Sequence, residues 1–144
     1  MTVFVDAGVF YAAFDTAATR HQDARAALET VLTDPQYGRT ATSDYIYDET
    51  MTLTQRRTGS TQQAVAVGER LRSTDESAAI TMIHVTEPLF EAAVDAFERY
   101  DDQRLNFTDA VTVAIAETPH ADCVLSFDDD FDGIIERIEP AAIA

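Results

Sequence analysis

The stretch TVFVDAGVFYAAF, residues 2–14, decides the fold class of this chain. Its first four residues are mostly β-branched or aromatic and end at Asp6, and an apolar run of helical length follows Ala7 and Gly8. This pattern predicts a short buried strand over Thr2–Val5 that leads directly into a helix. A strand followed by a helix is the first half of a crossover unit, which places the next strand parallel to the first.

The rest of the chain repeats this alternation. We predict helices over residues 21–32, 43–57 with Ser43 as the N-cap, 60–73 and 106–117, a helix opened by residues 86–88, and strands over residues 39–42, 79–85, 121–126 and 134–138. Strands separated by helical segments are typical of a parallel sheet covered on both faces. The sequence therefore predicts a three-layer α/β/α fold, with a central parallel sheet of four to five short strands, in a single domain over residues 1–144.

The charge of the chain is strongly acidic. There are 26 acidic and 10 basic residues, a formal net charge of −16, and all of the basic residues are arginine. Such a charge opposes binding to nucleic acid or to an anionic membrane at low salt. At molar salt the Debye length falls to about 3 Å and this repulsion is screened. Lysine-free acidic surfaces resemble those of extreme halophiles, so we expect a halophilic archaeon as the source.

Cysteine usage and the N-terminus indicate where the protein works. The single cysteine, Cys123, cannot form an intramolecular disulfide and lies in an apolar run. No basic region precedes the first apolar residues, and no apolar segment approaches the roughly 18 residues of a membrane span. We therefore expect a soluble cytoplasmic protein with no membrane partner.

Two predicted strands end in acidic residues. Asp6 directly follows the first strand, and Asp128 follows the apolar run VLSF at the start of the acidic stretch DDDFD. In open parallel sheets, ligands bind beyond the carboxyl ends of the strands. A helix N-cap would explain Asp6 taken alone. Because two strands end in the same way, the pattern favours a binding site.

Two predicted helices add one carboxylate each. Glu49 lies within the apolar stripe marked by Tyr45, Ile46 and Leu53, where a carboxylate is costly unless it is paired, protonated or bound to a cation. An ion pair with an arginine is the alternative for Glu49. Asp109 lies in the first turn of a helix that is apolar on nearly every side and is therefore expected to be buried. The helix dipole favours an anion there, which is the alternative explanation for Asp109.

Four converging carboxylates would need a counter-charge, and the chain has no lysine to supply it. A hard divalent cation, Mg²⁺ or Mn²⁺, fits this set of oxygen ligands, and either one or two ions would do so. The missing lysine argues against response-regulator receivers and haloacid-dehalogenase-like phosphatases. The chain also lacks GxxxxGK[ST] and GxGxxG, and its one cysteine and three scattered histidines show no zinc-ligand spacing.

Four segments together resemble the PIN-domain ribonucleases, and in particular the VapC-type toxins of prokaryotic toxin–antitoxin pairs. The resemblance covers nearly the whole chain and depends on VFVDAGVFYAAF, TSDYIYDETMTLTQRRTG, LNFTDAVTVAIAE and VLSFDDDFDGI. By position, the acidic residues of the family correspond to Asp6, Glu49, Asp109 and Asp128.

One departure from the family pattern follows the first aspartate. The family usually carries a small hydroxyl residue and then serine or asparagine, where this chain has Ala7 and Gly8. Any hydrogen bond that those side chains give the site in the family is either absent here or supplied by Thr108 or Ser126. Asp130 matches an accessory acidic position of the family and is the alternative to Asp128 as the fourth acid.

The activity implied by the resemblance is metal-dependent endoribonuclease cleavage that leaves a 5′-phosphate and a 3′-hydroxyl. Asp6 and Asp109 would bind the ion directly, and Glu49 and Asp128 would complete the pocket directly or through water. The candidates for contacts with the RNA backbone are Arg56, Arg57 and Arg104.

The resemblance also implies a small VapB-like antitoxin as partner, and a homodimer. Two alternatives stay open at this point. One is a housekeeping PIN nuclease that acts on ribosomal or transfer RNA without an antitoxin. The other is a catalytically inactive PIN domain that binds RNA or protein.

Overall fold

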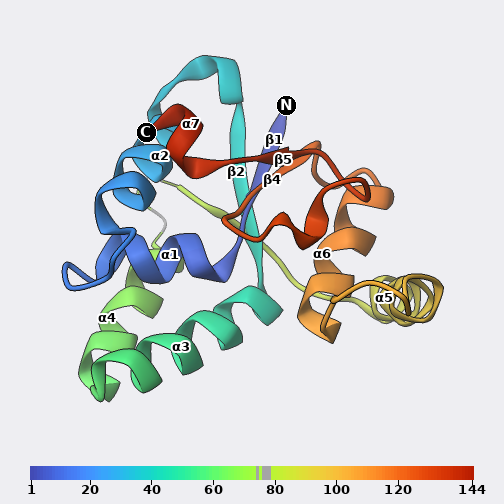
Figure 1. Ribbon diagram of the computed structural model, residues 1–144, viewed down its shortest axis with the longest axis horizontal. Coiled ribbons are helices and arrows are strands. Elements are labelled where there is room, and N and C mark those ends of the chain that lie inside the picture. Colours follow the sequence, from blue (N-terminus) through green and yellow to red (C-terminus); the bar gives the residue numbers. More distant parts are fainter. Residues whose placement is uncertain (74, 76–78) are drawn as a thin grey trace.

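The computed structural model describes residues 1–73, 75 and 79–144. Its centre is a five-stranded sheet in the order β3-β2-β1-β4-β5 (Figure 1). Every neighbouring pair of strands is parallel. The strands are β1 (Thr2–Val5), β2 (Arg39–Ser43), β3 (Thr81–Ile83), β4 (Cys123–Leu125) and β5 (Arg137–Ile138).

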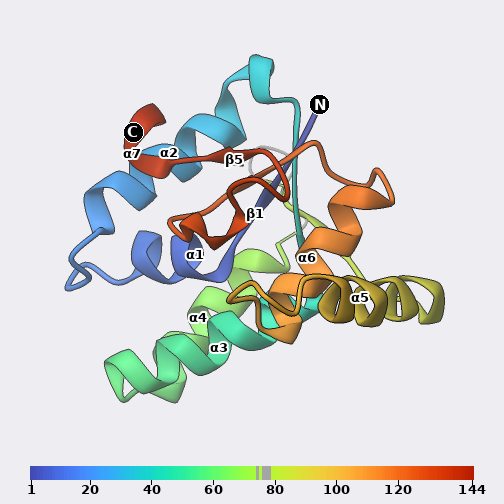
Figure 2. The ribbon, with the colours of Figure 1, turned by 45° about the vertical axis from the view of Figure 1, so that its right-hand side comes forward.

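Helices cover both faces of this sheet, as Figures 1 and 2 show. They are α1 (Ala7–Phe14), α2 (His21–Thr33), α3 (Asp44–Thr58), α4 (Thr61–Leu71), α5 (Glu87–Arg99), α6 (Phe107–Glu117) and α7 (Pro140–Ile143). Helix α1 packs against α2, and α5 packs against α6 on the other side of the sheet. Helix α3 contacts both α1 and α6 near the carboxyl ends of the strands. The predicted three-layer α/β/α fold is confirmed.

The helix ends follow from local side-chain chemistry. Ser43 accepts a hydrogen bond from the Ile46 N–H at 3.1 Å, which confirms it as the N-cap of α3. Gly59 ends α3 in the left-handed conformation, with φ of 68°, which glycine adopts without steric cost. Asn106 and Asp109 form a reciprocal capping box at the start of α6.

Several boundaries differ from those predicted. Strands β3 and β4 each have three residues, and β5 has two, so all three are shorter than the apolar runs that contain them. A strand ends where its hydrogen bonds to the neighbouring strands end, and the apolar pattern of the sequence does not predict that position. The 3-10 turns η1 (Pro35–Tyr37) and η3 (Asp129–Phe131) and helix α7 are additional elements.

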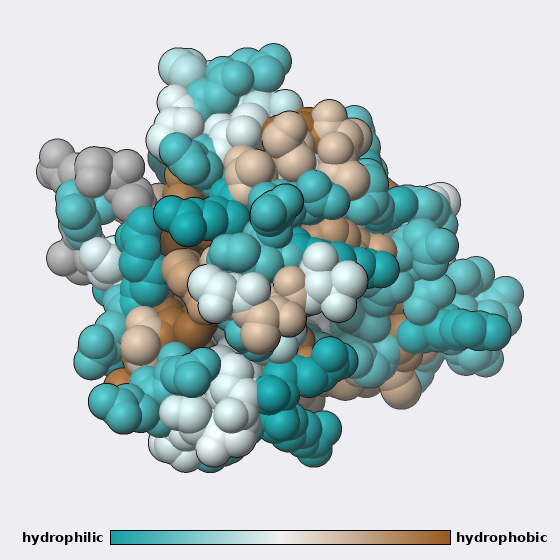
Figure 3. All heavy atoms as spheres, turned by 60° about the vertical axis from the view of Figure 1, so that its left-hand side comes forward, coloured by the Kyte–Doolittle hydropathy of each residue, from teal (hydrophilic) through white to brown (hydrophobic). Residues whose placement is uncertain are grey.

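The core is continuous between the layers. Phe4, Phe10 and Phe131 are among its largest fully buried side chains, and Cys123 is also buried. In α6, every residue from Asp109 to Ile115 is buried, as the sequence predicts. Hydrophilic residues cover most of the face shown in Figure 3. Among the described residues, none of the helices has the length and apolarity to cross a bilayer.

Candidate active site

The sheet reverses its strand order at β1. Strands β2 and β3 lie on one side of β1, and β4 and β5 lie on the other. The ends of β1 and β4 are in register, because Val5 pairs with Leu125 and the N–H of Asp6 donates to the Leu125 carbonyl at 3.1 Å. The chain therefore brings Asp6 next to the segment that carries Asp128, at the point where open α/β sheets bind ligands.

A buried serine joins these two strand ends. The Ser126 hydroxyl donates to Asp6 Oδ2 at 2.6 Å and accepts from the Asp128 N–H at 3.0 Å. The other oxygen of Asp6 accepts from the Ala7 N–H at 3.0 Å. Of the two hydroxyl residues considered from the sequence, Ser126 makes this contact in the described structure, while the Thr108 carbonyl accepts from Thr112. Asp6 is thus held at both oxygens.

The four predicted acids line one cavity of about 250 Å³, which we call the acidic pocket: Asp6, Glu49, Asp109 and Asp128. Asp109 is only 7% exposed, and its Oδ2 accepts from the Asn106 N–H at 3.1 Å. Asp130 is not among the residues that line the pocket.

Glu49 lies beside the buried face of α3 and not at its centre. The buried residues of α3 are Ile46, Thr50 and Thr54, two of them threonines that a count of apolar residues does not include. Glu49 and Leu53 therefore lie along the edge of this face, where both line the acidic pocket. Glu49 is half-buried, at the edge of the stripe within which the sequence places it.

Burial and mutual repulsion raise the pKa values in the pocket. Burial is the main cause for Asp6, whose pKa is raised although Ser126 and the Ala7 N–H lower it. Burial, followed by the charges of Asp6 and Asp128, raises the pKa of Glu49 to about 7. Burial also raises the pKa of Asp109 to about 7, with contributions from the charges of Asp6, Asp128 and Glu49. The carboxylates therefore share one electrostatic environment, in which none of them is paired with an arginine among the described residues.

This set of residues fits a hard divalent cation. Within the described residues, none of the four acids forms an ion pair with an arginine, which removes the alternative proposed for Glu49. Glu49 Oε2 is buried and has no hydrogen-bond partner there. Asp128, Asp129 and Asp130 bring one oxygen each within 4.8 Å of one another, and of these three residues Asp128 also lines the acidic pocket. Carboxylate oxygens are the ligands that Mg²⁺ and Mn²⁺ prefer.

The turn after β4 is fixed by an ion-pair cluster that the sequence did not predict. The Arg137 guanidinium donates to both oxygens of Asp132, at 2.7 and 3.2 Å, and to Glu139. It also donates to the Ser126 carbonyl at 2.9 Å. Asp132 is therefore paired with Arg137, although its side chain is exposed. Such contacts join residues from separate elements, and the periodicity of apolar residues in the sequence does not predict them.

The arginines proposed from the sequence lie in different places. A second cavity, of about 390 Å³, adjoins the acidic pocket. Arg56 is exposed and lines neither of the two cavities. Arg57 lines that neighbouring cavity. Arg104 is close enough to Asp130 to lower the pKa of that carboxyl, which burial and the charges of Asp128 and Asp129 raise. Arg20, which precedes α2, lines both cavities and was not predicted, because a single arginine before a helix carries no distinguishing signal.

We expect the metal-free protein to lose stability as the pH rises. Glu49 and Asp109 ionise near pH 4 in an unfolded chain and near pH 7 in the folded one, so the folded state binds more protons in between. The free energy of unfolding should fall between these pH values, and Mn²⁺ should reverse most of the fall. Urea unfolding at constant high salt, with chelator and with Mn²⁺, measures this. Glu49→Gln should flatten the dependence, and an unchanged slope in that variant would contradict the assignment.

Comparisons with known proteins agree with this geometry. A model of the PIN domain matches residues 3–136. The 23S rRNA-specific endonuclease VapC20 of Mycobacterium tuberculosis is 31% identical over 129 residues, which are 90% of this chain and 91% of that protein. The crystal structure of VapC20, described as a sarcin-ricin loop cleaving toxin, matches with a TM-score of 0.77 and 29% identity, over 93% of this chain and 97% of that one. A toxin–antitoxin complex from Klebsiella pneumoniae, at 19% identity and a TM-score of 0.65 over 96% and 97% of the two chains, shares the fold.

Proposed function

The chain belongs to the PIN-domain family, and from this premise we propose that it is a VapC-type endoribonuclease toxin that cleaves 23S rRNA. The observation that carries the proposal is the acidic pocket at the switch point of the sheet, where four carboxylates line one cavity. The substrate is taken from the similarity to VapC20 along most of both chains.

The pocket suggests a role for each acid in hydrolysis. A bound Mg²⁺ or Mn²⁺ would offset the charge of the carboxylates and of the phosphate, and would make water a better nucleophile. Asp6 and Asp109 are held in place by hydrogen bonds from Ser126 and from the Asn106 N–H. Glu49 lines the pocket beside them, and its carboxyl group would contact the cation directly or through water. These are the roles that we propose for the site residues.

The acidity of the chain sets a condition on this function. A net charge of −16 repels RNA unless salt screens it or cations neutralise the pocket. We propose that the protein works at high salt, with the divalent cation lowering the local negative charge where the phosphate must approach. The halophilic source predicted from the composition is consistent with this condition and stays a prediction.

We further propose an antitoxin as the physiological partner, because a cell that produces a ribonuclease toxin has to restrain it. The relative with 29% identity and a known structure is described as a toxin. A homodimer, which the resemblance also implies, stays a prediction. Purification together with the product of the adjacent gene tests the partner, and sedimentation of the purified chain tests the oligomeric state.

We expect the purified protein to cut an RNA fragment that contains the sarcin-ricin loop, at one position, in high salt with Mn²⁺ or Mg²⁺. A chelator should abolish the cleavage, because the carboxylates then repel the phosphate and no cation activates water. Gel analysis of end-labelled RNA measures both results. A fragment of the same length with a scrambled loop is the matched control and should stay intact.

The outcomes separate the proposed function from its alternatives. Cleavage of transfer RNA but not of the loop fragment would support the housekeeping nuclease. Binding of RNA without cleavage under any metal would support the inactive binding module. Cleavage that persists in the chelator would contradict a metal-dependent site.

A further inference from the structure

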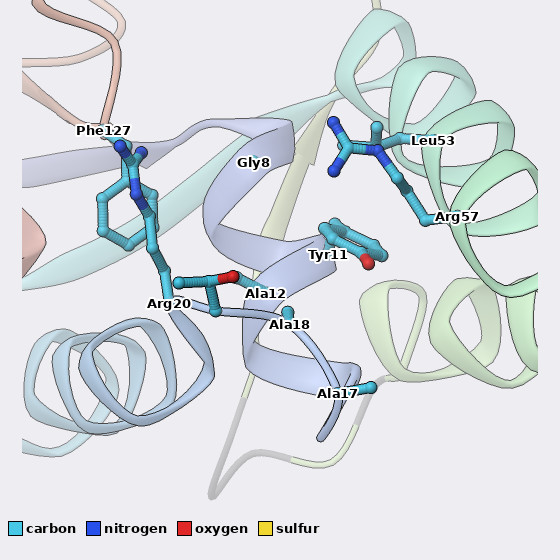
Figure 4. A pocket seen from close by; sticks show the side chains of 10 residues that line it. Gly8, Tyr11, Ala12, Ala17, Ala18, Arg20, Leu53, Arg57 and Phe127 are labelled. Atoms are coloured by element: carbon cyan, nitrogen blue, oxygen red, sulfur yellow. The ribbon is translucent and has the colours of Figure 1, made fainter.

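A second cavity, of about 390 Å³, adjoins the acidic pocket. The two cavities share Gly8, Arg20, Leu53 and Phe127 as lining residues. Figure 4 shows this second cavity, which we call the arginine groove, with Arg20 and Arg57 on opposite sides of α1. A molecule bound in the acidic pocket can therefore extend into the groove without leaving the protein surface.

Each of the two arginines lies over an aromatic ring. The guanidinium carbon of Arg20 lies 4.6 Å from the centroid of the Phe127 ring, and that of Arg57 lies 5.8 Å from the centroid of Tyr11. The Tyr11 hydroxyl donates to Asp15 at 2.5 Å, which fixes that ring.

The two guanidinium groups keep their hydrogen-bond donors free. In the part of the chain that the structure describes, neither forms an ion pair or a hydrogen bond, although the chain has 26 acidic residues. An arginine with stacked faces and free edges is suited to binding a phosphate through paired N–H groups. The groove thus offers two unpaired guanidinium groups in a strongly acidic molecule.

Gly8 lies at the junction of the two cavities. A Cβ atom built on Gly8 meets no atom within 4 Å, and the residue does not have a positive φ. Neither packing nor backbone geometry therefore requires glycine at this helical position, where alanine favours the helix. What the missing side chain provides is open space between the acidic pocket and the arginine groove.

We infer that the arginine groove binds the single-stranded RNA next to the scissile phosphate. In this arrangement Arg20 and Arg57 contact backbone phosphates, and the strand passes over Gly8 into the acidic pocket. The inference rests on the proposed ribonuclease function, since it requires a scissile phosphate in that pocket. It also assigns a use to the Ala7-Gly8 departure from the family pattern.

Charge favours RNA over a protein as the occupant. A nucleic-acid strand presents phosphates at regular spacing, and the groove presents two guanidinium groups on opposite walls. The half-buried rings of Phe127 and Tyr11 also line the groove beside the guanidinium groups, and unpaired bases stack on aromatic rings of this kind. The continuity with the acidic pocket means that one strand can occupy both cavities.

The test measures binding of a short fluorescein-labelled single-stranded oligoribonucleotide by anisotropy, with Ca²⁺ in place of Mn²⁺. We expect the double variant Arg20→Gln/Arg57→Gln to bind about 100-fold more weakly than the wild type. The slope of log K against log salt should become less negative by about 1.4, because two phosphate contacts with a single strand are lost. Arg72→Gln, which removes an exposed charge outside both cavities, is the matched control and should change neither value.

Gly8→Leu gives an independent test, because it fills the junction without removing a charge. We expect binding of the same oligonucleotide to weaken about tenfold with the salt slope unchanged. Gly8→Ala, which adds one methyl group, should weaken binding less than Gly8→Leu does. The melting temperature of Gly8→Ala should equal or exceed that of the wild type, since its added Cβ meets nothing within 4 Å, and the melting temperature of Gly8→Leu is measured alongside to check that it is folded.

The results distinguish this inference from the proposed function. If the wild type binds the oligonucleotide through Arg20 and Arg57 but cleaves no RNA, the groove stands and the nuclease assignment fails. If the wild type cleaves RNA and the double variant binds and cleaves as Arg72→Gln does, the inference is wrong. Failure of the wild type to bind the oligonucleotide at any salt concentration at which it is folded would also overturn the inference.

Discussion

Replacing Asp6 with asparagine is expected to lower the rate of RNA cleavage about 1,000-fold, which corresponds to about 4 kcal/mol of transition-state stabilisation. Asp6 is the residue at which the strand end, the Ser126 hydroxyl and the α1 N-terminus meet. Asparagine keeps the shape of the side chain and can accept the Ala7 N–H. What it removes is the negative charge that a divalent cation requires of its ligand.

The same substitution should not unfold the protein. Burial raises the pKa of Asp6, so a neutral side chain at this position relieves an unfavourable charge in the metal-free state. We therefore expect Asp6→Asn to melt at or above the temperature of the metal-free wild type, while its affinity for Mn²⁺ falls. Calorimetry with and without Mn²⁺, alongside the cleavage assay, measures both effects.

Asp129→Asn is the matched control for this prediction. Asp129 is exposed on the turn that carries Asp128 and is not among the residues that line the acidic pocket. The substitution removes the same charge nearby, so it reports the contribution of the general negative field. Cleavage should remain close to that of the wild type. Equal losses in Asp129→Asn and Asp6→Asn would mean that net charge, and not ligation in the pocket, governs the reaction.

The fold was largely predictable because its local signals agree. The run that ends at Asp6 has the composition of a buried strand, and Ser43 and Gly59 mark the two ends of α3. The lengths of β3, β4 and β5 were not predictable, since each depends on hydrogen bonds from a neighbour far away in sequence.

The positions of the four acids were predictable from the elements that carry them. Asp6 and Asp128 follow strands, and Asp109 opens a helix that is apolar all round. The contacts that hold these acids were not predictable in the same way. Arg137 reaches the Ser126 carbonyl from β5, and Arg20 stacks on Phe127 from before α2. No pattern among the neighbouring residues in the sequence identifies either arginine, because only the folded chain brings each arginine to its partner.

The acidic stretch after β4 shows why a cluster of like charges needs the structure to divide it. Asp128 lines the pocket and caps the turn η3 by accepting from the Asp130 N–H at 2.9 Å. Asp132 pairs with Arg137, and Asp129 is exposed. Phe131, in the middle of these charges, is fully buried. A single apolar side chain thus anchors a turn that is otherwise made of aspartates.

Phe131→Ala is accordingly expected to be severe, with a loss of about 3–5 kcal/mol in the free energy of unfolding. Phe131 is fully buried, so the substitution leaves a cavity lined by core residues. The Phe131 carbonyl accepts from the N–H groups of Ile134 and Ile135, at 3.0 and 3.2 Å, and alanine keeps these backbone bonds, so the loss comes from side-chain packing. For a domain whose whole stability is of the order of 10 kcal/mol, this is a large fraction. Urea unfolding at high salt measures it.

Cleavage should fall in Phe131→Ala even at temperatures where the protein remains folded, because the turn carries Asp128 into the acidic pocket. Phe131→Leu separates the two effects: it keeps most of the buried apolar volume and should cost about 1.5 kcal/mol or less. We expect its cleavage rate to stay within a few-fold of the wild type. If Phe131→Ala, compared at equal folded fraction, cleaves as fast as Phe131→Leu, then the turn does not position Asp128. The acidic pocket would in that case work with three carboxylates, Asp6, Glu49 and Asp109.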